Sequence, residues 1–302
     1  MREEIFRSPL FYVGDKYKLI KEIRQYFPKD INSFIEPFAG GGSVFLNTNA
    51  RSYFLNDIDS NVIQIHNFLK DSSLNEEAFF NKLQEQITSY NLSHSYLKDV
   101  VPKEIKTKWG KTYYAKFNKE GFNKLRSDFN KSNKSDTLKL YLLLIYGFNR
   151  MLRFNSMGNY NLPVGNVDLN SNVINALNHY FQIIKAKNIT FYNLDYKDFL
   201  NQINIQKEDF IYFDPPYLIT FSEYNKLWNE ENERQFINYL NFLHSQGFKF
   251  AVSNVINYKG RENRIFKEWA ENFKIVDIKS NYISYHDNSI KNFNEILVLN
   301  YE

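Results

Sequence analysis

Four residues in the second half of the chain, Asp214-Pro215-Pro216-Tyr217, combine an acid, two rigid prolines and an aromatic ring. They follow the apolar run at residues 210–213, which places them at the carboxyl end of a predicted buried strand. A nucleobase amine is a poor nucleophile, because its lone pair is delocalised into the ring. Asp214 and a proline carbonyl can accept hydrogen bonds from its two N–H groups while Tyr217 stacks on the base. The tetrapeptide predicts catalytic residues for amine methylation; the alternative is an ordinary strand-to-loop turn.

A glycine turn follows another predicted strand, at residues 33–38. Gly40-Gly41-Gly42 lets the backbone approach a ligand where a Cβ would clash, and an apolar helix is expected to start just after it, with its amide dipoles facing that ligand. A P-loop is excluded because no Gly-Lys-Ser/Thr follows, and the G-x-G-x-x-G spacing of a dinucleotide site is absent. The turn therefore predicts a nucleoside ligand without a pyrophosphate.

The next predicted strand, at residues 53–56, is followed by an acidic segment. A carboxylate at this position can accept hydrogen bonds from both hydroxyls of a ribose. We assign this role to Asp57 and expect its neighbour Asp59 to cap the following helix; the alternative is that both acids only cap.

The composition excludes several classes of protein. A chain of 302 residues with 43% hydrophobic residues can bury a large core. It has no cysteine and five scattered histidines, so we expect no disulfide and no protein-bound metal. No apolar stretch is long enough to span a membrane and the amino terminus is charged, so we expect a cytoplasmic protein.

The net charge of +4 is unevenly placed. Residues 97–170 hold 14 Lys/Arg and 6 Asp/Glu, and aromatic residues such as Trp109 and Tyr113 lie between the lysines. This pattern suits neutralisation of phosphates beside bases or sugars. A solvated lysine-rich surface over an ordinary aromatic core is the alternative.

The order of predicted elements indicates an α/β fold, a Rossmann-like doubly wound sheet with ligands at the carboxyl ends of its strands. Strands are expected at residues 33–38, 53–56, 190–193, 210–213, 248–253, 274–283 and 296–301, and helices at 16–27, 61–69 and 76–90. The alternation of predicted strands and helices stops after Tyr90 and resumes near Thr190. We therefore expect a catalytic domain of residues 1–75 and 175–302, interrupted by a mainly helical insert with a β-hairpin at 76–174.

The chain resembles the Dam family of adenine-specific DNA methyltransferases, the α-group in which a target-recognition insert precedes Asp-Pro-Pro-Tyr. The similarity covers nearly the whole chain and keeps the order of the motifs. The matching segments are residues 36–47, 56–59, 153–165, 214–217, 253–254 and 294–298.

The resemblance implies that S-adenosylmethionine is the methyl donor. Residues similar in position to the cofactor site of the family are Tyr12, Lys16, Glu36, Phe38, Gly40, Gly42, Asp57, Asp195 and Asp214. The family segment Lys-Trp-x-Gly-Gly-Lys reads here Phe11-Tyr12-Val13-Gly14-Asp15-Lys16, without the tryptophan and the second glycine. Asp195 looks like the acid that reads the cofactor adenine; alternatively, it starts a helix.

The resemblance also implies double-stranded DNA as the substrate. Arg153 looks like a base-contacting residue able to donate two bonds to guanine, or alternatively an ion-pair partner within the insert. The other residues placed by the resemblance at the DNA are Asn149, Met151, Asn155 and Pro163. Residues 155–161 read as a hairpin that enters the groove.

These features lead to one hypothesis, methylation of adenine N6 at GATC or at a site that shares its GA or GAT core. The target base must leave the duplex to reach a closed pocket, so base flipping is expected. A cognate restriction endonuclease acting on the same site is a partner that the resemblance allows. The enzyme is expected to be bacterial or phage-encoded and to associate with the nucleoid through DNA. The alternatives are methylation of cytosine N4 or of RNA, and an inactive DNA-binding homologue.

Overall fold

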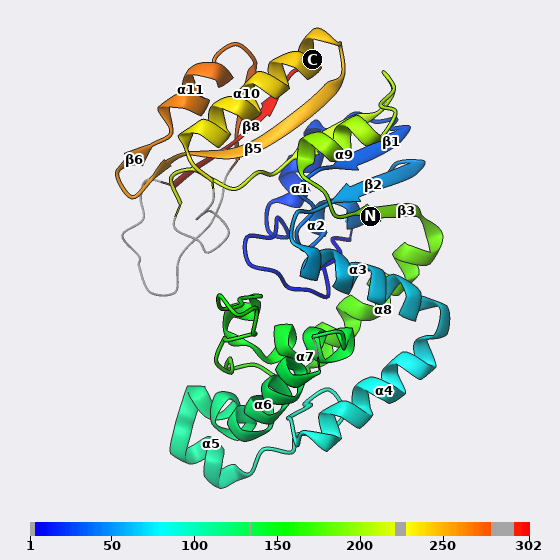
Figure 1. The fold of residues 1–302 in the computed structure, drawn as a ribbon, viewed down its shortest axis with the longest axis vertical. Coiled ribbons are helices and arrows are strands. Elements are labelled where there is room, and N and C mark those ends of the chain that lie inside the picture. The colour runs from blue at the N-terminus through cyan, green and yellow to red at the C-terminus, as the bar shows by residue number, and fades with distance from the viewer. Residues whose placement is uncertain (1–3, 133, 221–227, 279–292) are drawn as a thin grey trace.

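The computed structural model describes residues 4–132, 134–220, 228–278 and 293–302. Its centre is a sheet in the order β3-β2-β1-β4-β5-β8-β7, with the short β6 paired to β5 (Figure 1). The strands are β1 (Ser33–Glu36), β2 (Ser52–Asn56), β3 (Asn188–Tyr192), β4 (Phe210–Phe213), β5 (Lys249–Tyr258), β6 (Arg261–Glu262), β7 (Lys274–Ile278) and β8 (Phe293–Leu299).

The five strands from β3 to β5 are parallel, and β8 runs antiparallel to both of its neighbours. The chain moves from β1 outward to β2 and β3 and then returns to the other side of β1 as β4, so the direction of winding reverses between β1 and β4. Ligands of doubly wound sheets bind at the carboxyl ends of the strands at such a point. The predicted fold class is confirmed.

Alternate residues of the central strands enter two separate hydrophobic clusters. Phe34 and Tyr212 pack on one face of the sheet, whereas Ile35, Ile211 and Phe213 pack on the other. Successive side chains of a strand point to opposite faces, so a strand covered on both sides must be apolar throughout. This explains why β4 is a continuous apolar run.

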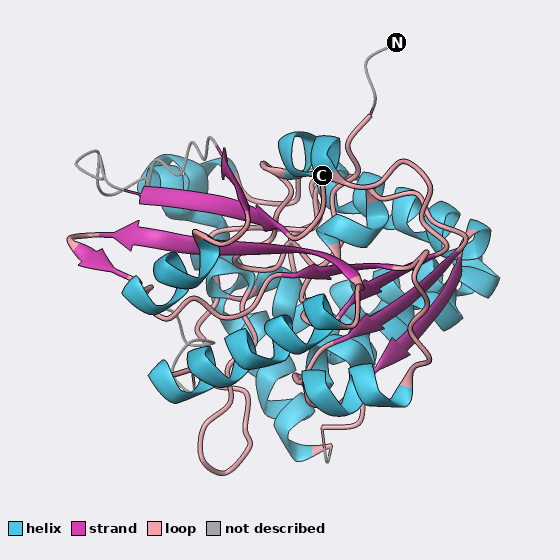
Figure 2. Cartoon of the chain, turned by 90° about the horizontal axis from the view of Figure 1, so that it is seen from above, coloured by secondary structure: helices cyan, strands magenta, loops and turns pink. Residues whose placement is uncertain are grey.

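Helices cover both faces of the sheet (Figure 2). The helices of the sheet layers are α1 (Ile20–Ile23), α2 (Ser43–Leu46), α3 (Ser60–Ser72), α8 (Ser171–Ala186), α9 (Tyr196–Gln202), α10 (Glu230–Ser245) and α11 (Arg264–Ala270). Side-chain caps start several of them: Asp59 accepts from the amide of Asn61 at α3, and Asp195 accepts from that of Lys197 at α9. The predicted cap at Asp59 is confirmed.

Two predicted helices are shorter than expected. Residues 16–19 form turns in which the Lys16 carbonyl accepts from Leu19 and Ile20, so α1 begins only at Ile20 and a 3₁₀ turn (Arg24–Tyr26) follows it. The helix after the glycine turn, α2, has a single turn, so its dipole contributes little. The strand predicted at 274–283 is described only as far as Ile278; its remainder lies outside the described residues.

Between β2 and β3 the chain forms a helical insert, drawn from cyan to green in Figure 1. Its helices are α4 (Glu76–Ser89), α5 (Lys103–Trp109), α6 (Tyr113–Lys131) and α7 (Thr137–Tyr146). Helix α7 is buried from Leu140 to Tyr146 and packs against α3. One hydrophobic cluster runs from the sheet through α7 and α8 into α6, so the insert and the sheet share a core.

Candidate active site

A cavity of 520 Å³ opens at the carboxyl ends of β1, β2 and β4. All twelve residues that the sequence assigns to cofactor binding or catalysis line it. These residues are Tyr12, Lys16, Glu36, Phe38, Gly40, Gly42, Asp57, Asp195, Asp214, Pro215, Pro216 and Tyr217. Segments far apart in the sequence therefore build one site, as expected at the point where the winding of the sheet reverses.

The glycine turn after β1 forms one wall of the cavity. Gly40 (φ +47°) and Gly42 (φ +80°) have left-handed backbones, and a Cβ on Gly42 would clash with the Phe45 ring. Buried His66 holds the turn, with Nε2 2.9 Å from the Gly40 carbonyl oxygen and Nδ1 2.9 Å from the Tyr180 hydroxyl. Burial lowers the pKa of His66 to about 4, so it is neutral at physiological pH. A neutral His66 can donate to Gly40 and accept from Tyr180.

Asp57 is fixed beneath this turn by two backbone donors. Its Oδ2 accepts from the Gly40 amide at 2.8 Å, and its Oδ1 accepts from the Asp59 amide at 2.9 Å. Burial raises the pKa of Asp57 to about 6. Each carboxylate oxygen keeps a second lone pair, so Asp57 can still accept hydrogen bonds from a ligand.

Glu36, the last residue of β1, is 1% exposed and lines the cavity. Its Oε2 is buried without a hydrogen-bond partner. Burial, reinforced by the negative charge of Asp214, holds the pKa of Glu36 well above its usual range. A buried carboxyl oxygen without a partner is costly unless a ligand donor satisfies it, and an ammonium group is such a donor.

An aromatic wall closes the part of the cavity next to Asp195. The Phe38 ring lies 5.3 Å from the Tyr196 ring and 6.2 Å from the Trp228 ring, measured between centroids. Asp195 caps α9 and also lines the cavity, so its two predicted roles are compatible in position. Exposed Ile58 adds an apolar surface. This part of the cavity suits a flat ring with an amino group at its edge.

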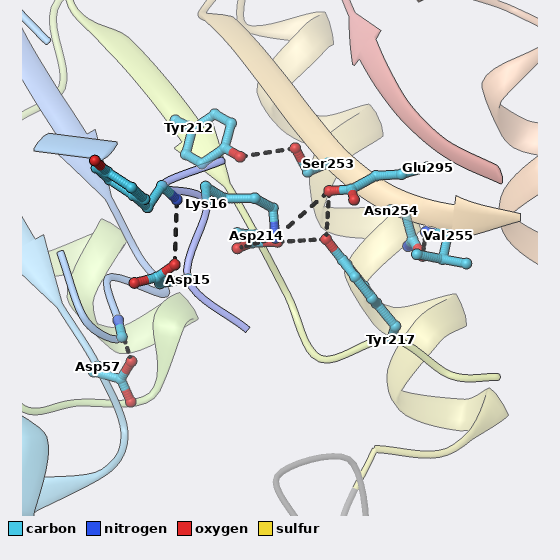
Figure 3. A network of polar contacts seen from close by, with 12 residues as sticks. Asp15, Lys16, Asp57, Tyr212, Asp214, Tyr217, Ser253, Asn254, Val255 and Glu295 are labelled. Atoms are coloured by element: carbon cyan, nitrogen blue, oxygen red, sulfur yellow. Dashed lines mark hydrogen bonds and ion pairs between the residues drawn. The ribbon is translucent and has the colours of Figure 1, made fainter. Parts of the chain in front are cut away.

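Asp214 belongs to a buried network with Lys16, Tyr217 and Glu295 (Figure 3). The Lys16 ammonium lies 2.7 Å from Asp214 Oδ2 and 3.6 Å from Glu295 Oε1. The Tyr217 hydroxyl donates to Asp214 Oδ1 at 2.8 Å and also lies 3.3 Å from Glu295 Oε1. These contacts orient the Asp214 carboxylate at the cavity wall.

The charge of Lys16 is what permits two carboxylates to share this site. Burial alone would lower the pKa of Lys16, but Asp214 and Glu295 reverse this effect and hold it well above its usual value. Burial raises the pKa of Glu295, and Lys16 opposes that rise. Lys16 therefore stays protonated and lies against Asp214 at the cavity wall.

Four further residues received no role from the sequence. Glu295 belongs to the network around Lys16, and the cavity is also lined by Trp228, Asn232 and Gln235. Glu295 could have been noticed as a lone acid ahead of the apolar run at residues 296–299. The other three come from the start of α10 and its preceding loop, and no local motif marks them.

The residues assigned to DNA lie outside the cavity, in the insert. Asn149 has a left-handed backbone (φ +53°), and the neighbouring Phe148 amide donates to the Pro163 carbonyl. Phe148 is 49% exposed, which sequence reasoning did not single out. Met151 packs partly against the core.

A hairpin follows this loop, closed by an antiparallel bridge between Phe154 and Tyr160. The Asn155 side chain organises its turn by accepting from the amides of Met157 and Asn159. Arg153 donates through Nε to Asn161 Oδ1 at 2.9 Å, so across the hairpin it contacts an amide and not an acid. The exposed tip is thus well ordered by its own hydrogen bonds.

Comparison with known proteins decides the family. The family model described as D12 class N6 adenine-specific DNA methyltransferase matches residues 12–283. The chain belongs to this family. The methyltransferase match includes the glycine turn, the insert and the Asp214 motif.

Individual relatives of this chain differ in length. The modification methylase StsI of Streptococcus sanguinis is 30% identical over 311 residues, which cover 99% of this chain and 44% of the relative. The type II methyltransferase M.FokI of Planomicrobium okeanokoites is 32% identical, covering 98% and 43% respectively. The chain thus spans less than half of these two relatives. The DNA adenine methylase of Escherichia coli K12 is 32% identical over 70% of this chain and 65% of its own length.

Two further findings concern the residues that the structure describes. Within these ranges, no group of three or more histidine and acidic side chains is arranged to hold a metal ion. No helix among them is both long and apolar enough to cross a membrane.

Proposed function

We propose that this methyltransferase transfers a methyl group from S-adenosylmethionine to N6 of adenine in double-stranded DNA. The observation that carries the proposal is that two groups of residues line one cavity. One is the glycine turn above Asp57, and the other is the Asp214 carboxylate held by Lys16. Family membership makes adenine the expected acceptor.

The residues present fit this cofactor. The unpartnered Glu36 Oε2 suits the ammonium of its amino-acid part, and Asp57 suits the ribose hydroxyls. Asp195 and the Phe38 ring suit the adenine. When bound, S-adenosylmethionine supplies an electrophilic methyl group on a sulfonium.

Asp214 and the prolines act on the acceptor. The carboxylate accepts a hydrogen bond from one proton of the adenine amine, and a carbonyl of Pro215 or Pro216 accepts from the other, which draws the nitrogen toward tetrahedral geometry. The Tyr217 ring stacks on the base. Lys16 and the Tyr217 hydroxyl hold the Asp214 carboxylate in place before the base arrives.

The insert supplies the DNA contacts. We propose that Arg153, Asn149, Met151, Asn155 and Pro163 read a site such as GATC or one sharing its GA or GAT core, and that the target adenine leaves the duplex to reach Asp214. The long relative StsI is named a modification methylase, so a restriction endonuclease with the same site is a proposed partner. We place the enzyme in the cytoplasm with its DNA.

A direct test is to incubate the purified chain and Asp214→Ala with S-adenosylmethionine and unmethylated plasmid, cytosine-rich duplex or RNA. The nucleosides are then released by digestion and identified by mass spectrometry. The proposal expects N6-methyladenine from DNA with the native chain alone. N4-methylcytosine, methylation confined to RNA, or an active Asp214→Ala would overturn it.

A further inference from the structure

Two arginines from distant parts of the chain lie on one aromatic ring. The guanidinium carbon of Arg7 is 4.4 Å from the centroid of the Phe11 ring, and that of Arg150 is 4.0 Å from the same centroid. Arg7 belongs to the amino-terminal segment, whereas Arg150 follows α7 in the insert. The ring, 6% exposed, thus holds two like charges together at the junction of the insert and the sheet.

These charges have no anionic partner within the described ranges of the chain. Neither guanidinium forms an ion pair there, and Nε of Arg150 is buried without a hydrogen-bond partner. The acids that influence them electrostatically are Asp15 near Arg7 and Asp168 near Arg150, both beyond ion-pair distance. Burial, together with the nearby charge of Arg7, lowers the pKa of Arg150 to about 10, yet Arg150 remains charged at neutral pH.

The backbone is strained where it presents these side chains. Phe11 (φ +47°), Asn149 (φ +53°) and Arg150 (φ +50°) are left-handed residues other than glycine. Such conformations persist when the surrounding structure imposes them, and they concentrate at binding sites. The Tyr141 hydroxyl ties α7 to this segment by donating to the Pro9 carbonyl at 3.1 Å.

The pair lies between the cavity and the surface assigned to DNA. Phe11 directly precedes Tyr12, which lines the cavity, and Arg150 directly follows Asn149 and exposed Phe148. Figure 1 shows the dark blue amino-terminal segment facing the green loops of the insert. Neither arginine is among the residues that line the cavity.

We infer that Arg7 and Arg150 form a clamp for a backbone phosphodiester of the target strand, beside the nucleotide whose base enters the cavity. This inference rests on the proposed function. Guanidinium groups match the oxygens of a phosphodiester, and a phosphate here would satisfy Nε of Arg150 while neutralising two charges that otherwise repel each other. Because the pair lies between the cavity and the surface assigned to DNA, we expect the phosphate of a nucleotide turned out of the duplex to lie near it.

The test is a methylphosphonate scan. Single neutral methylphosphonates replace successive phosphates around the target adenine, and binding is measured by fluorescence anisotropy for the native chain, Arg7→Gln, Arg150→Gln and the double variant. Arg51→Gln is the matched control, because Arg51 is an exposed arginine at the amino end of β2, the edge of the sheet opposite the cavity.

The native chain and Arg51→Gln should lose affinity about tenfold at one phosphate or at two adjacent ones, as for a charge-assisted hydrogen bond. The double variant should bind unmodified DNA more weakly and lose nothing further at that position. Its plot of log Kd against log salt concentration should be shallower by about 0.9 for each phosphate that the variant no longer neutralises.

If each methylphosphonate lowered the DNA affinity of the native chain and of the double variant by the same factor, the clamp would be overturned. Because Arg7 is exposed, Arg7→Gln tests the inference even if Arg150→Gln does not fold, which a thermal melt reveals. Binding does not require catalysis, so the two claims can fail separately. If the native chain methylates adenine but no single phosphate substitution weakens its binding more than that of the double variant, the clamp alone is refuted. If such a phosphate is found but the native chain does not methylate DNA, the proposed function is refuted.

Discussion

Lys16 and Asp214 form a buried ion pair, with 2.7 Å between the ammonium nitrogen and Oδ2, and Lys16 is only 4% exposed. The pair links the turn before α1 to the loop after β4 and leaves the second carboxylate, Glu295, within 3.6 Å of the same ammonium. The Lys16 ammonium thus lies close to the carboxylates of both Asp214 and Glu295.

Removing the Lys16 ammonium should destabilise the folded protein. Lys16→Met is expected to lower the free energy of unfolding by about 3–5 kcal/mol, because breaking a buried ion pair leaves uncompensated charge. The further change Glu295→Gln should restore part of the loss, which denaturant unfolding of the single and double variants measures. Lys18→Met, at an exposed neighbouring position, is the control and should change little. A Lys16→Met protein as stable as the control would show that the pair does not form.

Asp57 should make cofactor binding depend on pH. Its pKa of about 6 means that the carboxylate is ionised above that pH, so affinity for S-adenosylmethionine should fall as pH drops from 7 to 5, approaching tenfold per unit. Its effect on stability has the opposite sign. The folded protein holds the proton more tightly than the unfolded chain, so the contribution of Asp57 to stability improves as pH falls through 6 toward 4.

Both trends can be checked against Asp57→Asn. Calorimetric titration should give weak binding to this variant with a flatter pH dependence, and thermal melts should show the native chain gaining stability relative to the variant as pH falls. A native chain whose affinity and pH profile match those of Asp57→Asn would remove Asp57 from the site.

Glu36 should release a proton when the cofactor binds. Its pKa lies well above the usual range because of burial and the charge of Asp214, whereas an ammonium beside Oε2 favours the ionised form. Calorimetry at pH 7 in two buffers of different ionisation enthalpy gives the number of protons released. That number should fall in Glu36→Gln; an unchanged number would mean that the ammonium lies elsewhere.

Arg153 should affect which DNA sequence is methylated. Arg153→Ala is expected to reduce discrimination at one base pair by about 1–3 kcal/mol, because the variant has no guanidinium to bind guanine O6 and N7. Competition between oligonucleotides that differ at single base pairs measures this. Asn161→Ala removes the acceptor of Arg153 Nε and should have a smaller effect at the same pair. Equal loss for all sequences would indicate a phosphate contact instead.

Local patterns predicted the elements that carry their own signal. The apolar run at Phe210–Phe213 is β4 with the expected bounds, because a strand buried on both faces must be apolar throughout. The glycine turn and the acids after β2 and β4 were recognisable for a similar reason, since each needs a special backbone or charge at a strand end. All of them line the cavity.

Long-range contacts were not predictable in this way. Lys16 reads as part of a helix, but its carbonyl and side chain are used in a turn and in the ion pair with Asp214, so the helix starts later. Glu295 and Trp228 reach the site from strands and loops distant in the chain. The stacking of Arg7 and Arg150 on Phe11 likewise depends on how the insert meets the sheet.

The most direct test of the central claim is to express the native chain and Asp214→Ala in cells without DNA methylation, and to map modified bases on their plasmids by single-molecule sequencing. We expect N6-methyladenine at one short motif with the native chain and at least about 10³-fold less with the variant. Plasmid free of N6-methyladenine, despite soluble protein that binds S-adenosylmethionine, would contradict the account.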